Sequence, residues 1–191
     1  FGTHQRSRLV RNLEGSTVEA GRQYIDNHLR LVNDYMRFGE TAEAMGLLHR
    51  ALDAARSYGH DSASRREVMF SLAVAHLKRR EQLGCLTVSG SADCILHASG
   101  PSLQFGRRNA TIAIEYLLRL LEADPDDMGA RWLLNVANMV RGSYPNQVPS
   151  RYLIPPVALG SDYPIGPFKN IAPAVGLNAI ELAGGSMIED F

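Results

Sequence analysis

The feature that most constrains the fold is a stripe of alanines and leucines that occurs twice with the same spacing. Each stripe runs at helical spacing, so its residues lie on one face of a helix. The alanines allow a second helix to approach closely, and the leucines fill the space between the two helices. The first stripe is Ala44, Leu48, Ala51 and Leu52, and the second is Ala113, Leu117, Leu120 and Leu121. A chain with two such faces is expected to be mainly α-helical.

Each stripe is preceded by a segment suited to be its partner helix. Leu31, Tyr35 and Phe38 share one face at helical spacing, and Gly39 ends that run before the first stripe. The segment REVMFSLAVAHLKRRE precedes the second stripe, and MGARWLLNVANMVRG, which ends at Gly142, would begin a third pair. A single helix pair cannot bury both of its faces, so the pairs are expected to stack.

This alternation resembles the tetratricopeptide repeat. In that repeat the first helix carries a small residue and an aromatic, the second carries alanines, and a proline closes the unit. Pro125 follows the second stripe in the closing position. The resemblance implies a helix-pair solenoid of about two and a half units over residues 24–142. A generic helical bundle is the alternative.

The remaining segments differ in composition from the helices. Residues 1–23 are expected to form an N-terminal arm, and residues 83–106, rich in small residues, an inserted loop within the helical domain. Seven of the nine prolines follow Ser143. Because proline fixes φ and lacks an N–H donor, residues 143–191 are expected to form an extended or turn-rich Pro/Gly-rich tail.

Both cysteines of the chain, Cys85 and Cys94, lie in the expected inserted loop. A disulfide between them would close a loop of about ten residues and stabilise the fold by roughly 2–3 kcal/mol. Such a bond persists only in an oxidising compartment. Two alternatives stay open, namely free buried thiols and a metal site with His97 as a third ligand. The spacing matches no common zinc motif, and structural zinc requires four ligands.

Several short and uncommon sequence motifs occur in order after Leu83. They are the cysteine pair, PDD, ARWLLN, YP, VP and YLIPP, followed by FKNIAPAVGLNAIELAGGSMIEDF. This series resembles secreted bacterial proteins of the ASPIC and UnbV type, relatives of the cartilage acidic proteins. In these proteins tetratricopeptide repeats precede an FG-GAP (VCBS-like) calcium-binding β-propeller. The resemblance implies a secreted, extracellular or periplasmic protein whose last residues enter the first propeller blade.

The same resemblance implies that calcium belongs to residues beyond this chain. In that family an acidic D-x-D-x-D-G loop follows the EDF sequence, and its alternating acids converge on one calcium ion. Asp190 would be the first acid of such a loop, and the given sequence ends at Phe191. No complete metal site and no cofactor are therefore expected within this chain, with calcium expected if the propeller continues.

The sequence contains no evident catalytic constellation, so an enzyme is not expected. The six histidines lack the i, i+4 pairing of helical metal sites, and no G-x-S-x-G or phosphate-binding glycine loop occurs. The 20 basic and 20 acidic residues give a formal net charge of zero, which does not predict nucleic-acid binding. No apolar run approaches the roughly 18 residues of a membrane-spanning helix, so membrane insertion is not expected.

The main functional expectation is a secreted, non-catalytic scaffold. Stacked first helices would form a concave groove for a protein or peptide partner. Asn33, Arg37, Asn135 and Asn138 are the candidate groove residues, since an amide can pair with backbone groups of a ligand. The alternative is a structural subunit that self-associates into an oligomer or extracellular filament, with its tail packed on neighbouring chains. A second alternative is an accessory region of a larger enzyme.

A few residues carry two interpretations. Asn109 begins an N-x-T glycosylation pattern, but it also suits an N-cap because it lies at the expected start of a helix. Trp132 is expected to pack between repeats rather than to stack on a ligand. Tyr144, Tyr152 and Tyr163 are expected to dock the tail, with their rings buried and their hydroxyls in water.

Overall fold

Consecutive helices make up most of the described chain. The computed structural model describes residues 2–15, 21–57, 62–87, 101–160, 171 and 174, and among these residues there is no strand. The α-helices are α1 (Gly2–Glu14), α2 (Arg22–Arg37), α3 (Thr41–Ser57), α4 (Ser62–Thr87), α5 (Pro101–Ala123) and α6 (Met128–Arg141). Two 3-10 helices follow, η2 (Ser150–Tyr152) and η3 (Pro156–Leu159). The expected mainly α-helical fold is confirmed.

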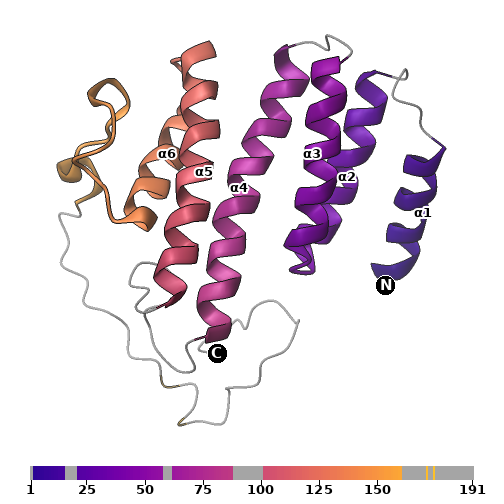
Figure 1. Ribbon diagram of the computed structural model, residues 1–191, viewed down its shortest axis with the longest axis horizontal. Helices are drawn as coiled ribbons and strands as arrows, with labels where there is room; N and C mark the ends of the chain where they lie inside the picture. The colour runs from indigo at the N-terminus through magenta and orange to yellow at the C-terminus, as the bar shows by residue number, and fades with distance from the viewer. Residues whose placement is uncertain are drawn as a thin grey trace, which may run out of the picture. The chain divides into compact units, whose positions relative to one another are not determined.

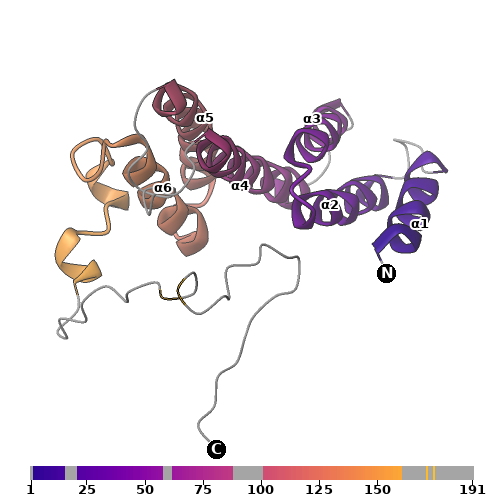
Figure 2. The same ribbon diagram turned by 90° about the horizontal axis from the view of Figure 1, so that it is seen from below.

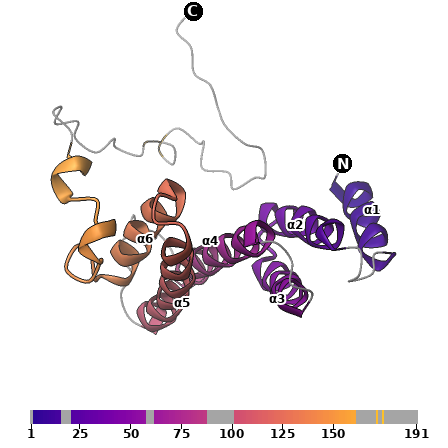
Figure 3. The ribbon, with the colours of Figure 1, turned by 90° about the horizontal axis from the view of Figure 1, so that it is seen from above.

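The chain divides into two compact units, residues 1–158 and 159–191. All the α-helices belong to the first unit, in which each helix packs against the next along the chain (Figure 1). Within that unit, α3 and α5 lie on one side and α2 and α6 on the other, with α4 between them (Figures 2 and 3). The helices are therefore arranged as a row of consecutive pairs. In the second unit only four residues are described, and one of them, Ile171, is exposed.

The two predicted stripes are buried in the core of the fold. Ala44, Leu48 and Ala51 of α3 are fully buried in a cluster with residues of α2 and α4. Leu117 and Leu121 of α5 are fully buried in a second cluster with residues of α4 and α6. Their burial confirms that the shared spacing marks helix faces that pack against neighbouring helices.

Helix α4 connects the two clusters. Leu72 belongs to the first cluster and Ala73 to the second, and Met69 packs against both. Successive residues of a helix point about 100° apart, so a helix with apolar residues on two faces can be enclosed by neighbours on both sides. This position explains why α4 contacts both α3 and α5.

Glycines end two of the helices where the sequence predicts an end. Gly39 follows α2 and Gly142 follows α6, and both have φ of 77°. This left-handed conformation is accessible to glycine at little energetic cost because it has no Cβ. The N–H of Gly142 donates to the carbonyl of Met139. At the other end of α6, the carboxylate of Asp127 accepts a hydrogen bond from the N–H of Ala130 at 2.9 Å.

The expected N-terminal arm contains a helix instead. Leu9 of α1 is buried in the first cluster. Arg6 pairs with Asp34 of α2 at 2.7 Å and with Glu40 at 2.8 Å, and its guanidinium lies over the ring of Tyr35. These contacts join residues roughly 30 positions apart, and so local periodicity did not reveal them.

The expected insertion is also shorter than predicted. Helix α4 continues to Thr87, and α5 begins at Pro101, so only residues 88–100 separate the two helices. Pro101 suits the first helical position because its missing N–H would have no partner within the helix.

Candidate functional site

A groove between α2 and α4 is the candidate functional site. It encloses about 420 Å³. Half of its lining comes from the C-terminal half of α2 and half from the middle of α4. The lining residues are Val32, Asn33, Met36, Arg37, Phe70, Ser71, Val74 and Lys78.

The spacing of these residues places them on facing sides of the two helices. Asn33 and Arg37 are four residues apart on α2, and Phe70, Val74 and Lys78 are each four residues apart on α4. Residues at that spacing lie one above the other on a helix. Phe70 and Val74 are half-buried and form an apolar floor, whereas Asn33, Arg37 and Lys78 are exposed.

The groove carries positive charge without an acidic neighbour in its wall. No acidic side chain lines it. In the described part of the chain, neither Arg37 nor Lys78 forms an ion pair. Two exposed cations above an apolar floor can bind a carboxylate together with apolar side chains. The lining contains no nucleophile beside a base, and the described residues hold no cluster of three or more His, Cys, Asp or Glu side chains that could bind a metal.

The structure brings two of the four predicted groove residues into this site. Asn33 and Arg37 line the groove, and their contact with a partner stays a prediction. Phe70, Val74 and Lys78 were not singled out, although their segment was recognised as the first helix of a pair. Applying the same four-residue spacing to that segment would have found them.

Asn135 does not line the groove, and its burial corrects that prediction. It is almost fully buried, and its side chain holds the segment that follows α6. The amide nitrogen donates to the carbonyl of Tyr152 at 2.9 Å, and the amide oxygen accepts from the N–H of Ile154 at 3.0 Å. Both ends of the amide are therefore used within the chain, and no peptide can reach them in this conformation.

Asn138 is buried for a similar structural reason. Its amide nitrogen donates to the carbonyl of Leu134 at 2.9 Å, and its amide oxygen accepts from the hydroxyl of Ser143 at 2.8 Å. The side chain thus stabilises the turn by which the chain leaves α6. The prediction of Asn138 as a partner-binding residue is wrong for the same reason as that of Asn135.

The aromatic residues near α6 differ in part from expectation. Trp132 is 57% exposed and does not pack between repeats. The ring of Tyr152 is buried as expected, but its hydroxyl donates to the carbonyl of Leu121 at 2.8 Å instead of facing water. The hydroxyl of Tyr144 likewise donates to the carbonyl of Ile154 at 2.7 Å. Tyr163 lies outside the described residues.

Asn109 lies inside α5 and is not an N-cap. Its side-chain oxygen is 3.0 Å from Nδ1 of the buried His76 on α4. Burial lowers the pKa of His76 below its ordinary value, and the hydrogen bond to Asn109 opposes that shift only in part. The pair is therefore a partly buried polar contact between neighbouring helices, and glycosylation at Asn109 stays a prediction.

The remaining predicted site residues are not tested. Cys85 falls on the backbone of α4, but its side chain is not described, and Cys94, His97 and Asp190 lie outside the described residues. The Cys85–Cys94 disulfide and the calcium-loop acid therefore stay predictions.

Comparison of the chain with protein-family models, with curated proteins and with solved structures gave no significant match. Among the described helices, none is both long and apolar enough to cross a membrane.

Proposed function

We propose that this chain is a non-catalytic interaction scaffold of the tetratricopeptide type. It binds an extended peptide segment of a partner protein, with apolar residues and at least one acidic residue, in the groove between α2 and α4. The observation that carries this proposal is the apolar floor of Phe70 and Val74 beside the exposed cations Arg37 and Lys78.

The row of helix pairs supports the assignment of repeat type. Alanine and leucine stripes on α3 and α5 are buried against the preceding helices, and Pro125 follows α5. Helices α4 and α5 are 26 and 23 residues long, whereas α2 and α3 are 16 and 17 residues long. The extra residues of α4 and α5 lie next to residues 88–100. We interpret them as an extension of both helices of the second pair at the end where residues 88–100 connect them.

An extended peptide fits the spacing of the groove. Side chains one turn apart on a helix are separated by about 5.4 Å. Alternate side chains of an extended peptide are separated by about 6.6 Å. Two alternate apolar side chains can therefore contact Phe70 and Val74, and an acidic side chain further along can reach Lys78 or Arg37. Asn33 and Ser71 can hydrogen-bond the peptide backbone between them.

A charge-reversal experiment tests this proposal. Fluorescently labelled ten-residue peptides would share the same apolar residues and differ only in acidic, neutral or basic residues between them. We expect the purified chain to bind the acidic peptide most tightly. The variants Arg37→Glu and Lys78→Glu should weaken acidic-peptide binding by about tenfold and prefer the basic peptide.

The matched control is Arg107→Glu on α5, which reverses one exposed charge away from the groove. It should preserve the order of the three peptides. If the groove variants also preserve that order, or if the chain binds all three peptides equally, the proposed site is wrong.

The setting that we propose is extracellular or periplasmic, with the chain joined to a calcium-binding β-propeller. The ordered series of short motifs after Leu83 supports this setting, and it includes the pair of Cys85 and Cys94. Intact mass before and after reduction tests the disulfide, because the oxidised chain lacks the mass of two hydrogens. An unchanged mass on reduction would contradict it.

Self-association is a second candidate function, favoured by one specific feature of α6. Met128 is 66% exposed and Trp132 is 57% exposed, one helical turn apart. A second copy of the chain could cover this apolar face. Light scattering after size-exclusion chromatography should then show a concentration-dependent dimer that the Trp132→Lys variant abolishes. A monomer at all concentrations would exclude this candidate.

A further inference from the structure

Four arginines line a hollow formed by three different helices. The hollow encloses about 290 Å³ and is lined by Arg56 of α3, Arg65 and Arg66 of α4, and Arg119 of α5. Met69, Leu120 and Ala123 complete the wall. It shares no lining residue with the groove between α2 and α4. Nothing in the proposed peptide binding requires this hollow.

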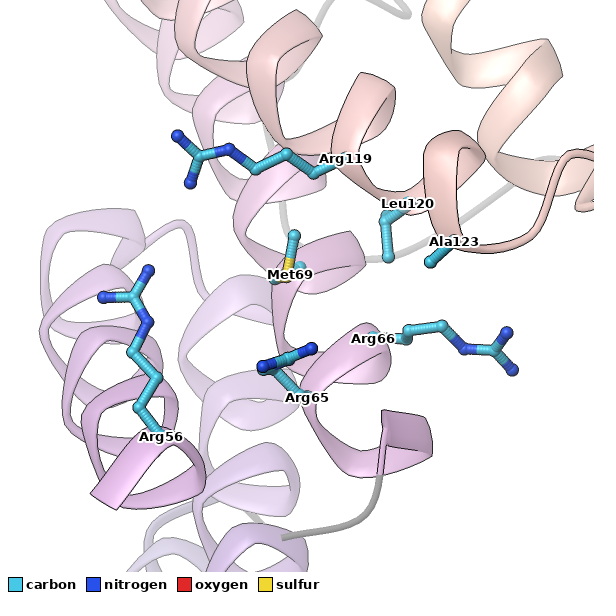
Figure 4. A pocket seen from close by; sticks show the side chains of 7 residues that line it. All are labelled: Arg56, Arg65, Arg66, Met69, Arg119, Leu120 and Ala123. Atoms are coloured by element: carbon cyan, nitrogen blue, oxygen red, sulfur yellow. The ribbon is translucent and has the colours of Figure 1, made fainter. Parts of the chain in front are cut away.

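Three of the four arginines surround one space. Figure 4 shows the side chains of Arg56, Arg65 and Arg119 around the space beside Met69, whereas Arg66 points away from them. Arg66 pairs with Asp124 at 3.0 Å. The arginines around the common space are thus Arg56, Arg65 and Arg119, one from each helix.

Only one of these three arginines has an acidic partner in the described structure. Arg56 lies 3.8 Å from Asp53 of its own helix, a long and exposed contact. Arg65 and Arg119 form no ion pair with any described residue. Like charges held around one space repel each other, and this repulsion is relieved when an anion enters. No acidic side chain lines the hollow to supply that charge.

We infer that this hollow binds the phosphate group of a small-molecule phosphate monoester. Arginine has a planar guanidinium whose N–H groups match pairs of phosphate oxygens. A phosphate monoester carries a charge of about −1.5 to −2 near neutral pH and three acceptor oxygens, which the three arginines can share. A carboxylate or a sulfate ester carries only one negative charge. The apolar atoms of Met69 and Leu120 beside the arginines would contact the organic part of the ligand.

The test measures binding of phenyl phosphate to the full chain by calorimetry at matched ionic strength, with sodium acetate and phenyl sulfate as competing anions. We expect phenyl phosphate to bind most tightly at pH 7.5. Its affinity should fall as the pH is lowered to 5, because the second ionisation of a phosphate monoester has a pKa of about 6. The Arg65→Gln and Arg119→Gln variants should each weaken binding by about tenfold.

The matched control is Arg108→Gln, which removes an exposed charge from α5 outside the hollow. It should change the affinity by less than about twofold. Phenyl phosphate should also raise the melting temperature of the control and of the wild type, but not of the Arg65→Gln, Arg119→Gln double variant. That double variant should keep its helical circular dichroism, because both side chains are exposed.

Three results would overturn the inference. The first is equal binding of phenyl phosphate and phenyl sulfate at pH 7.5. The second is an equal loss of affinity in the control and in the two hollow variants. The third is a single-stranded oligonucleotide, whose phosphodiesters carry one charge each, binding more tightly than phenyl phosphate.

Discussion

At the scale of single residues, Asn33 and Asn135 have opposite roles although both were expected to contact a partner. Asn33 is exposed at the groove, whereas the amide of Asn135 is enclosed and bonded to the backbone at both ends. The net stabilisation by a hydrogen bond is modest, but leaving a buried backbone group without a partner destabilises a protein considerably.

Replacing each asparagine by alanine should therefore show that Asn135 contributes to stability and that Asn33 contributes to peptide binding. Asn135→Ala should lower the free energy of unfolding by about 1–3 kcal/mol, because the N–H of Ile154 loses its acceptor. Asn33→Ala should change it by less than about 0.5 kcal/mol while weakening peptide binding. Urea denaturation monitored by circular dichroism measures the first effect. Equal stability of the two variants would contradict the structural role of Asn135.

A second residue-scale prediction concerns pH and the buried histidines. Burial lowers the pKa of His76 and of His28 below their ordinary value, so both are neutral in the folded chain near neutral pH. In the unfolded chain they bind protons at higher pH. Below about pH 6.5 the unfolded state therefore binds more protons, and the free energy of unfolding falls as the pH falls.

Denaturation in urea at pH 7.5, 6.5 and 5.5 measures this dependence. Glutamine does not titrate and its amide can hydrogen-bond to Asn109, so His76→Gln should show a shallower loss of stability between pH 6.5 and 5.5. An identical pH dependence in the wild type and this variant would show that His76 does not contribute.

At the scale of helices, two glycines should respond oppositely to the same substitution. Gly46 lies inside α3 with open space where a Cβ would be, and Gly142 ends α6 with φ of 77° and equally open space. Steric contact with neighbouring atoms is therefore absent at both positions, and the backbone conformation alone decides the result.

We expect Gly46→Ala to stabilise the fold by about 0.5–1 kcal/mol, because alanine loses less backbone entropy in a helix. Gly142→Ala should destabilise it by about 1–2 kcal/mol, because a Cβ is strained in the left-handed region. Thermal denaturation of both variants measures the difference. A stabilising effect at Gly142 would mean that the end of α6 adopts another conformation.

At the scale of the whole helical unit, α4 contributes buried residues to both core clusters. Leu72 and Ala73 are neighbours in sequence, yet they belong to different clusters. Repeat proteins are stabilised by contacts between neighbouring units, and their cooperativity depends on the strength of those contacts. A helix that contributes to both clusters should make the two clusters unfold together.

Leu48→Ala tests that cooperativity. Leu48 is fully buried in the first cluster, so its truncation should lower the free energy of unfolding by about 2–4 kcal/mol. Trp132, the only tryptophan of the chain, lies on α6, whose core residues belong to the second cluster. The lower denaturation midpoint should appear equally in Trp132 fluorescence and in circular dichroism. An unchanged midpoint in fluorescence would mean that the helix pairs unfold independently.

The buried helices were predictable because the information that specifies them is local. The spacing of Ala44, Leu48 and Ala51 defines a helix face, and Gly39 and Gly142 mark helix ends by their backbone freedom. Such signals depend on residues within a few turns of each other. Helix α1 was missed since its stability depends on contacts with α2 and the residues after it.

The candidate site was predictable only in part, for a related reason. Asn33 and Arg37 were found because exposed polar residues of a first helix are natural groove residues. The same reasoning failed for Asn135, because the segment that covers α6 buries it. The presence of a polar residue in the sequence shows that its side chain can hydrogen-bond. It does not show whether the partner is a ligand or another part of the same chain.

Local periodicity and helix-end signals were enough to predict consecutive helix pairs with alanine-rich contact faces, since both are properties of neighbouring residues. The tertiary structure is needed to show which polar residues remain exposed. It placed Phe70, Val74 and Lys78 of α4 opposite α2, and it brought arginines from three helices around one hollow. Such convergence depends on how helices distant in sequence pack against one another, and no local pattern encodes it.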